Sequence, residues 1–183
     1  MAKQVLLVGA GGHAKVLISL LRDLGFQVVA AYDDDEAAWG TSILDVSVTG
    51  PIDRLSDQRQ IPALIAIGNN TVRQTISSRF EIEWLTVVHP RAHVDSSAEL
   101  GAGTVVMAGA VVQPLAQLGQ HVIVNTGASV DHDCLLGDFV HVAPGARVTG
   151  YGQLGNGVLL GTGAVAIPGI QIGEWTTVGA GAA

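Results

Sequence analysis

The sequence has few of the features on which many classes of protein depend. It contains one cysteine in 183 residues, which excludes an internal disulfide and fits a reducing compartment. It has no basic run and a formal net charge of −7, which argues against a nucleic-acid-binding surface. No apolar run reaches membrane-spanning length, and residues 1–10 lack the basic flank and cleavage site of a signal peptide. These absences predict a soluble cytoplasmic protein with neither nucleic acid nor membrane as a partner.

Aromatic residues are also scarce, at 4% of the chain, whereas 48% of the residues are hydrophobic and 24 are glycine. From Val94 to Ala183 the sequence is an unbroken repeat of fifteen hexads. The first position is Val, Leu or Ile in every hexad but one, where it is Ala166, and the fifth position is mostly small. A hexapeptide period is typical of a parallel β-helix, and three hexads close one coil. We therefore expect about five coils, with first and fifth positions inside and glycines at the corners.

The first part of the chain has a different pattern, so we predict two domains, 1–82 and 83–183. Residues 4–9 read as a buried strand, residues 14–24 as a helix and residues 27–32 as a second strand, which together make a βαβ unit. A glycine-rich turn, Ala10–His13, links the first strand to the helix, where a phosphate would meet a helix N-terminus. We also expect strands at 46–50, 63–67 and 84–88, and helices at 52–58 and 72–79.

The glycine-rich turn allows more than one interpretation. Residues 9–14 fit the dinucleotide pattern G-x-G-x-x-G/A, with Asp33 at a plausible distance. A dinucleotide fold needs two βαβαβ halves, however, and only about 80 residues precede the hexads. We therefore do not expect NAD. The turn can still hold a mononucleotide or its sugar conjugate, or the glycines can serve only to permit a tight turn.

The hexad Val130–Leu135 is the densest in ionisable groups. His132 lies between Asp131 and Asp133, at positions expected to point outwards, and a histidine paired with a carboxylate is a natural general base. The alternative is a solvated polar corner. His121, His132 and His141 show no ligand spacing such as H-x-x-x-H among themselves, so we expect no metal. Cys134 falls at an inward fifth position, which argues against a nucleophilic cysteine.

Several segments together resemble a known family. These are GAGGHAKV at 9–16, YDDD at 32–35, AIGNN at 66–70 and NTGASVDHDCLLGDFVHVAPGA at 125–146, followed by the remaining hexads. They resemble the bacterial sialic-acid O-acetyltransferase and nucleotide-sugar N-acetyltransferase family. The resemblance implies a Rossmann-like domain, a left-handed β-helix, a homotrimer and acetyl-CoA bound between neighbouring β-helices.

The resemblance also implies roles for individual residues. His132 matches the catalytic base and Asp133 its acidic partner. Asn125 matches a polar residue beside the substrate. The positions expected to contact acetyl-CoA are His141, Gly150, Thr162 and Ala180. The positions expected around the nucleotide sugar are Gly11, Gly12, His13, Asp33, Asp34 and Asn69.

The most specific function that the sequence supports is N-acetylation of a nucleotide-linked amino sugar, of the UDP-4-amino-sugar type, by direct transfer from acetyl-CoA. An O-acetyltransferase acting on sialic acid or another sugar is the alternative within the same class. A non-catalytic trimeric nucleotide-binding scaffold is the alternative from another class, and the pair His132–Asp133 argues against it. The sugar, the nucleotide and the acylated atom stay open. The sequence stops at Ala183 without the capping tail usual in the family, so we expect a truncated form or part of a longer chain.

Overall fold

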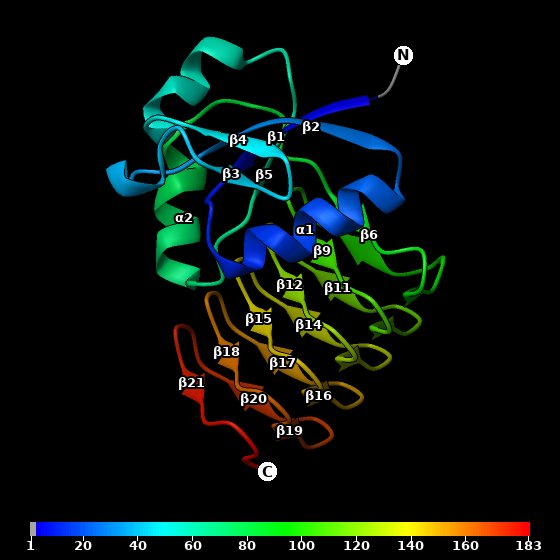
Figure 1. Ribbon diagram of the computed structural model, residues 1–183. Coiled ribbons are helices and arrows are strands. Elements are labelled where there is room, and N and C mark those ends of the chain that lie inside the picture. The colour runs from blue at the N-terminus through cyan, green and yellow to red at the C-terminus, as the bar shows by residue number, and fades with distance from the viewer. Residues whose placement is uncertain (1–2) are drawn as a thin grey trace. The chain divides into compact units, whose positions relative to one another are not determined.

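Figure 1 shows the computed structural model, which describes residues 3–183. The chain forms two compact units, one ending at Leu85 and the other running from Thr86 to Ala183. The predicted division lies between residues 82 and 83. None of the helices in the described part of the chain combines the length and the hydrophobicity that a membrane crossing requires.

The N-terminal unit is built on one five-stranded sheet in the order β3-β4-β2-β1-β5. Strand β1 pairs in parallel with β2 and β5, β2 pairs in parallel with β4, and β3 is antiparallel to β4. The elements of this unit are β1 (Lys3–Val8), α1 (Gly12–Asp23), β2 (Phe26–Tyr32), η1 (Glu36–Ala38), β3 (Ser42–Ile43), β4 (Val46–Thr49), η2 (Ile52–Gln58), β5 (Ala63–Ile65) and α2 (Asn70–Arg79). This arrangement confirms the predicted Rossmann-like fold.

Strand β1 lies in the middle of this sheet because its apolar residues can be covered on both faces. Leu6 and Val8 are buried with Leu55 of η2 and Ile76 of α2. Val5 and Leu7 alternate with them along the strand, so they point to the other face, where they are also fully buried. A continuous apolar run is what a parallel strand covered on both faces requires.

The carboxyl ends of β1, β2 and β5 meet at one edge of the sheet. The chain passes from β1 to β2 on one side and later returns to β5 on the other side of β1. A ligand crevice forms at such a switch point, outside the carboxyl ends of the strands. The glycine-rich turn, the acidic residues after β2 and the turn before α2 all lie at this edge.

The C-terminal unit is a parallel β-helix with three flat faces (Figure 1). Face 1 has the order β19-β16-β13-β10-β7, face 2 the order β20-β17-β14-β11-β8 and face 3 the order β21-β18-β15-β12-β9-β6. Face 1 consists of β7 (His93–Val94), β10 (Val111–Val112), β13 (Ser129–Val130), β16 (Arg147–Val148) and β19 (Val165–Ala166). Face 2 consists of β8 (Glu99–Leu100), β11 (Gln117–Leu118), β14 (Leu135–Leu136), β17 (Gln153–Leu154) and β20 (Gln171–Ile172). Face 3 consists of β6 (Val87–Val88), β9 (Val105–Val106), β12 (Ile123–Val124), β15 (His141–Val142), β18 (Leu159–Leu160) and β21 (Thr177–Val178).

The interior of the β-helix is made of the predicted hexad positions. First-position residues such as Val130 and Val142 and fifth-position residues such as Ala128 and Cys134 form its buried core. Each strand pairs with the strand eighteen residues further on, for example Val112 with Val130, so equivalent positions stack in columns. The period of six in the sequence is therefore the geometric period of the fold.

The corners follow a second rule. The fourth residue of every hexad from Gly103 to Gly181 has a positive φ, whether or not it is glycine. The non-glycine residues at these positions are Leu115, His121, Asp133, Phe139, Tyr151 and Trp175. A positive φ costs a residue with a Cβ atom about 1–2 kcal/mol, so glycine is frequent here.

Two details of the prediction were wrong. The repeat begins one hexad before Val94, at Val88, because Val88 and Ala92 already pack against the core of the β-helix. The predicted strand at 84–88 is divided between the two units. Trp84 makes a single bridge to Ala63, whereas Val87–Val88 is strand β6 of face 3. An apolar run alone does not reveal which of two adjacent sheets each residue joins.

Candidate functional site

His132 and Asp133 form an exposed hydrogen-bonded pair on the edge between faces 1 and 2. The His132 Nδ1 atom lies 2.8 Å from Asp133 Oδ2, and the two side chains are 47% and 35% exposed. A carboxylate only accepts hydrogen bonds, so Nδ1 carries the proton and Nε2 of the neutral ring is left as an acceptor. The other neighbour, Asp131, instead accepts a hydrogen bond of 2.8 Å from the backbone N–H of His132. The ring pairs with Asp133, and Asp131 holds the backbone.

Two residues of the next coil enclose the His132 ring. The Tyr151 ring meets it edge-on, with 5.1 Å between ring centroids and an angle of 89° between the planes. Gly150 lies directly against the imidazole, because a Cβ atom added there would be 2.8 Å from both Cε1 and Nε2. The ring is therefore held on several sides while its side chain stays half exposed.

Asn125 and His141 form a second polar pair on the β-helix. Asn125 Nδ2 donates to His141 Nε2 at 3.1 Å, while Asn125 Oδ1 accepts from the backbone N–H of Thr126. Asn125 lies on the edge between faces 3 and 1, and His141 lies in β15 of face 3. The structure therefore brings these two predicted residues together.

A single chain does not bring His132 and His141 together. His132 lies between β13 and β14, on the edge shared by faces 1 and 2, and this edge is opposite face 3. The three predicted groove residues also separate. Gly150 lies on the same edge as His132, whereas Thr162 and Ala180 lie on the edge between faces 3 and 1. A site that uses all of them needs two copies of the β-helix.

A groove of about 810 Å³ runs along face 2 and contains none of the predicted site residues. Its lining consists of outward-facing residues such as Gln117 and Gln153 and of second-position glycines such as Gly119. Its only charged lining residue is Glu99. We therefore place the candidate chemistry on the edge that bears His132 and not in this larger hollow.

The glycine-rich turn of the N-terminal unit is tied to the end of β2. The backbone N–H of Ala10 donates to Asp33 Oδ2 at 2.7 Å, and Asp33 Oδ1 accepts from the Asp35 N–H at 2.9 Å. Gly11 is the N-cap of α1 and makes no side-chain cap, and both Gly11 and Gly12 are exposed. Helix α1 therefore begins two residues before the predicted start, with an uncapped N-terminus at the switch point.

His13 lies in the first turn of α1, and its environment disfavours a charge. Its Nε2 atom is buried and has no hydrogen-bond partner among residues 3–183. Burial, with the Arg73 cation as a smaller cause, lowers the pKa of His13 from 6.5 to about 4. The ring is therefore neutral at physiological pH.

Arg73 lies beside His13 and is not among the residues predicted from the sequence. It is 1% exposed, and its guanidinium donates to Ile67 O at 3.1 Å, Gly68 O at 3.3 Å and Asn70 Oδ1 at 3.0 Å. Burial lowers the pKa of Arg73 to about 9. No sequence signal distinguishes this arginine, because the helix around it is polar.

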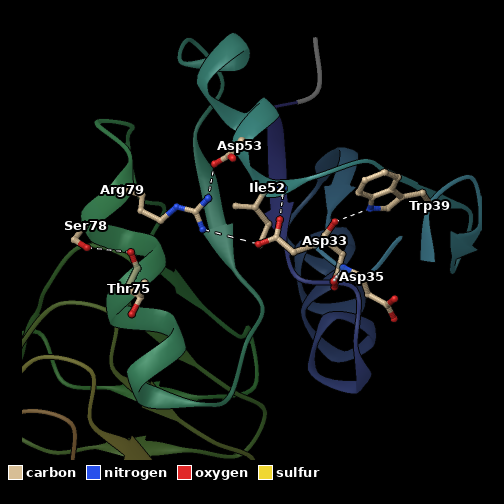
Figure 2. Close-up of polar contacts among 9 residues, drawn as sticks. Asp33, Asp35, Trp39, Ile52, Asp53, Thr75, Ser78 and Arg79 are labelled. Carbon is tan, nitrogen blue, oxygen red and sulfur yellow. Dashed lines mark hydrogen bonds and ion pairs between the residues drawn. The ribbon is translucent and has the colours of Figure 1, made fainter. Parts of the chain in front are cut away.

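A pocket of about 300 Å³ lies beside the acidic end of β2, within the N-terminal unit. Figure 2 shows Arg79 reaching from α2 towards Asp53. Arg79 Nη1 also lies 3.9 Å from Asp34 Oδ2, and Asp34 Oδ1 accepts from the Ile52 N–H at 2.9 Å. Asp33 holds Trp39 through its backbone oxygen, which accepts from Trp39 Nε1 at 2.7 Å. Polar groups and apolar walls therefore meet in this pocket, as in many sites for small molecules.

The last predicted residue of this unit, Asn69, has a structural task. Its side chain accepts a hydrogen bond from the Val72 N–H at 3.0 Å and caps α2. Among residues 3–183, no group of three or more His, Cys, Asp or Glu side chains is arranged to hold a metal ion. Cys134 is buried, and burial raises the pKa of its thiol.

The chain is similar to several known proteins. Residues 4–80 match the PglD N-terminal domain. The chain is 41% identical over 108 residues to UDP-N-acetylbacillosamine N-acetyltransferase of Bacillus subtilis, covering 55% of this chain and 50% of that protein. It is 32% identical over 100 residues to protein L142 of Acanthamoeba polyphaga mimivirus, covering 54% of this chain and 20% of that protein. The chain therefore spans half or less of the length of these two relatives.

Two solved structures match over most of their length. One is the acetyltransferase domain of PglB from Neisseria gonorrhoeae, with 38% identity, a TM-score of 0.91 and coverage of 98% of this chain and 89% of that one. The other is a variant of perosamine N-acetyltransferase from Caulobacter crescentus in complex with CoA and GDP-perosamine. It has 38% identity, a TM-score of 0.92 and coverage of 97% of this chain and 86% of that one.

These similarities cover both units and confirm the predicted order of a Rossmann-like domain followed by a left-handed β-helix. They also agree with the resemblance drawn from the motifs at 9–16 and 125–146. The chain belongs to the hexapeptide-repeat acetyltransferase family that includes the PglB acetyltransferase domain and perosamine N-acetyltransferase.

Proposed function

We propose that the protein is an acetyl-CoA-dependent N-acetyltransferase that acts on a nucleotide-linked amino sugar. The observation that carries the proposal is the His132–Asp133 pair, 2.8 Å apart and half exposed on the edge of the β-helix. The relatives support the substrate class, since one is named UDP-N-acetylbacillosamine N-acetyltransferase and another was solved with CoA and GDP-perosamine.

In this proposal His132 acts as the general base. Its Nε2 accepts a proton from the sugar amine as the amine nitrogen attacks the thioester carbonyl carbon of acetyl-CoA. The new C–N bond forms, the C–S bond breaks, and the imidazolium returns its proton to the departing sulfur of CoA. Asp133 stabilises the imidazolium and keeps the proton of the neutral ring on Nδ1. No covalent intermediate on the protein is needed.

The active site in this proposal is shared between subunits. His132 and His141 lie on opposite sides of one β-helix, so they can act on one substrate only if they come from two copies. We propose a homotrimer in which Asn125 lies beside the amino sugar and His141 near the acetyl group. Gly150, Thr162 and Ala180 then line the path of CoA. The reaction takes place in the cytoplasm, where acetyl-CoA is supplied.

The nucleotide is assigned to the N-terminal unit. The N-terminus of α1, at Gly11, Gly12 and His13, is suited to an anion because no side chain caps it. Asp33 and Asp34 line the pocket of about 300 Å³ beside it. Asn69 contributes by fixing the start of α2 at the same edge of the sheet.

The test is acetyl transfer by the purified protein to a panel of acceptors. The panel contains UDP- and GDP-linked 4-amino sugars, the matching hydroxyl sugars and free sialic acid, with thiol release and product mass as readouts. We expect turnover with an amino sugar and N-acetylation of the product. Turnover only with hydroxyl acceptors indicates an O-acetyltransferase, and nucleotide-sugar binding without thiol release indicates a scaffold.

The role of His132 is tested in the same assay. His132→Ala is expected to lower turnover by about 10²–10⁴-fold with little change in CoA binding, because a positioned base contributes a factor of that size. His93→Ala is the matched control, since His93 is an exposed histidine on the same β-helix outside the proposed site. Near-normal turnover of His132→Ala removes His132 from the mechanism.

A further inference from the structure

Gly150 occupies an unusual position in the repeat. Among the fifteen third positions of the hexads, from Ser96 to Ala180, it is the only glycine and His132 is the only histidine. The two residues are eighteen positions apart, which is one coil, so they lie one above the other on the same edge. Face 1 continues this register through the pairing of Val130 with Val148.

The space above Gly150 is filled by the imidazole. A Cβ atom on residue 150 would lie 2.8 Å from His132 Cε1, 2.8 Å from Nε2 and 3.4 Å from Nδ1. These are the three nearest atoms to that point, and all belong to the ring. Real Cβ atoms do not approach other atoms below 3.0 Å, so any other residue at 150 would displace the ring.

The backbone at this position does not itself require glycine. The φ of Gly150 lies outside the left-handed region, unlike that of the corner glycines Gly145 at 68° and Gly163 at 67°. An alanine could therefore adopt the backbone of Gly150 without strain. The contact with His132 is what the missing side chain accommodates.

We propose that Gly150 is a positioning residue for His132: its bare Cα forms a surface on which the imidazole rests with Nδ1 against Asp133. The inference rests on the proposed function, in which Nε2 accepts the proton. Three contacts then fix the ring. Asp133 binds Nδ1 at 2.8 Å, Tyr151 meets the ring edge-on, and Gly150 supports the side that bears Nε2.

The effect of Gly150→Ala on turnover depends on which atoms of His132 the added methyl group would contact. Because Cε1 and Nε2 are the nearest, the ring must tilt away from that side and strain or break the Nδ1–Asp133 hydrogen bond. A displacement of about 1 Å in a catalytic group can cost about 10²-fold in rate. Gly150→Ala is therefore expected to lower kcat by about 10–100-fold. The KM for the amino sugar should stay within about twofold, because Gly150 is not placed beside the sugar, so the loss is read in kcat.

The direct readout is the tautomer of His132, which needs no substrate. In the wild type, ¹⁵N NMR of histidine-labelled protein is expected to show a protonated Nδ1 and an unprotonated Nε2, with His132→Ala used for assignment. In Gly150→Ala the Nε2-protonated form should gain population as the Asp133 contact weakens. Gly173→Ala is the matched control, because Gly173 is a β-helix glycine outside the left-handed region whose added Cβ meets nothing closer than 3.9 Å.

A thermal double-mutant cycle tests the same contact through stability. Gly150→Ala should lower the Tm by several degrees when His132 is present and by about 1 °C or less in the His132→Ala background, because the clashing ring is then gone. If Gly150→Ala does not fold alone, the double variant should fold.

The inference is overturned if Gly150→Ala shows the wild-type tautomer and kcat, or if it costs the same Tm in both backgrounds. Failure of the double variant to fold also overturns it. If the protein acetylates none of the acceptors, the proposed function fails, whereas the tautomer and the thermal cycle still decide whether Gly150 positions His132.

Discussion

The two units present histidines in opposite environments. His132 stands on the β-helix edge, half exposed, with a carboxylate 2.8 Å from its ring. His13 stands in the first turn of α1, mostly buried, beside the cation of Arg73, and burial lowers its pKa to about 4. The carboxylate orients the ring of His132 through a hydrogen bond, whereas burial opposes a charge on the ring of His13.

The difference shows that residue type alone does not decide which histidine can serve as a base. A general base must take up a proton and give it back, so it needs a partner for its charged form. His132 has such a partner, whereas the charge that acts on the ring of His13 is the cation of Arg73. His13 is suited to a different role: as a neutral imidazole it can donate a hydrogen bond to a ligand or accept one from it.

The largest effect expected from this contrast is a pH dependence of stability in the N-terminal unit. The folded-state pKa of His13, about 4, is below the ordinary value of 6.5, so between these pH values the unfolded chain binds the proton and the folded chain does not. The contribution of His13 to the stability of this unit should therefore be constant above about pH 6.5 and fall as the pH drops towards 4, by up to about 3 kcal/mol.

Urea unfolding between pH 4 and 7.5 measures this effect. A Trp175→Phe background leaves the other two tryptophans, Trp39 and Trp84, both in the N-terminal unit, so that fluorescence reports that unit. The variant His13→Asn should lose most of the dependence on pH. An identical dependence in wild type and His13→Asn contradicts the assignment to His13.

The next effect concerns the partner of His132. Asp133→Asn keeps the size of the side chain but removes the charge that stabilises the imidazolium. Turnover should fall by about 10–100-fold, which corresponds to about 1.4–2.8 kcal/mol at the transition state. Steady-state kinetics provides the measurement, with Asp131→Asn as the control, because Asp131 contacts the His132 backbone and not its ring. An equal loss in both variants contradicts a specific role for Asp133.

The smallest expected effect is a change in the Tm when Asp133 is replaced by glycine. Asp133 has a φ of 57°, a conformation that costs a residue with a Cβ atom about 1 kcal/mol relative to glycine. Asp133→Gly should therefore raise the Tm by about 2–4 °C while turnover falls as in Asp133→Asn. Gly163→Ala, at a φ of 67° with open space around its Cβ position, should lower the Tm by a similar amount. A loss of stability in Asp133→Gly shows that the pair with His132 outweighs the backbone cost.

The repeat made most of the β-helix predictable. A first position such as Val130 and a fifth position such as Cys134 were assigned to the interior from spacing alone, because the chain returns to the same face every eighteen residues. The pairing of His132 with a carboxylate was also expected. Which of its two acidic neighbours it uses depends on the left-handed corner at Asp133, and no pattern of residue types shows that φ.

The parts that sequence could not supply are contacts between residues far apart in the chain. The burial of Arg73 beside His13 depends on how α1 and α2 are placed around the sheet edge, and both helices are ordinary in composition. The sequence does mark Gly150 as exceptional, because no other third position of the hexads is a glycine. Its meaning became visible only with the ring in place.

The columns of the β-helix also restrict how its length can change. Inserting six residues between His132 and Gly150 would move every later side chain to the neighbouring face, and inserting eighteen would keep the faces but place a foreign coil between the ring and its support. A longer or shorter solenoid in this lineage can therefore arise only by adding or deleting whole coils outside the stretch from Asp131 to Tyr151.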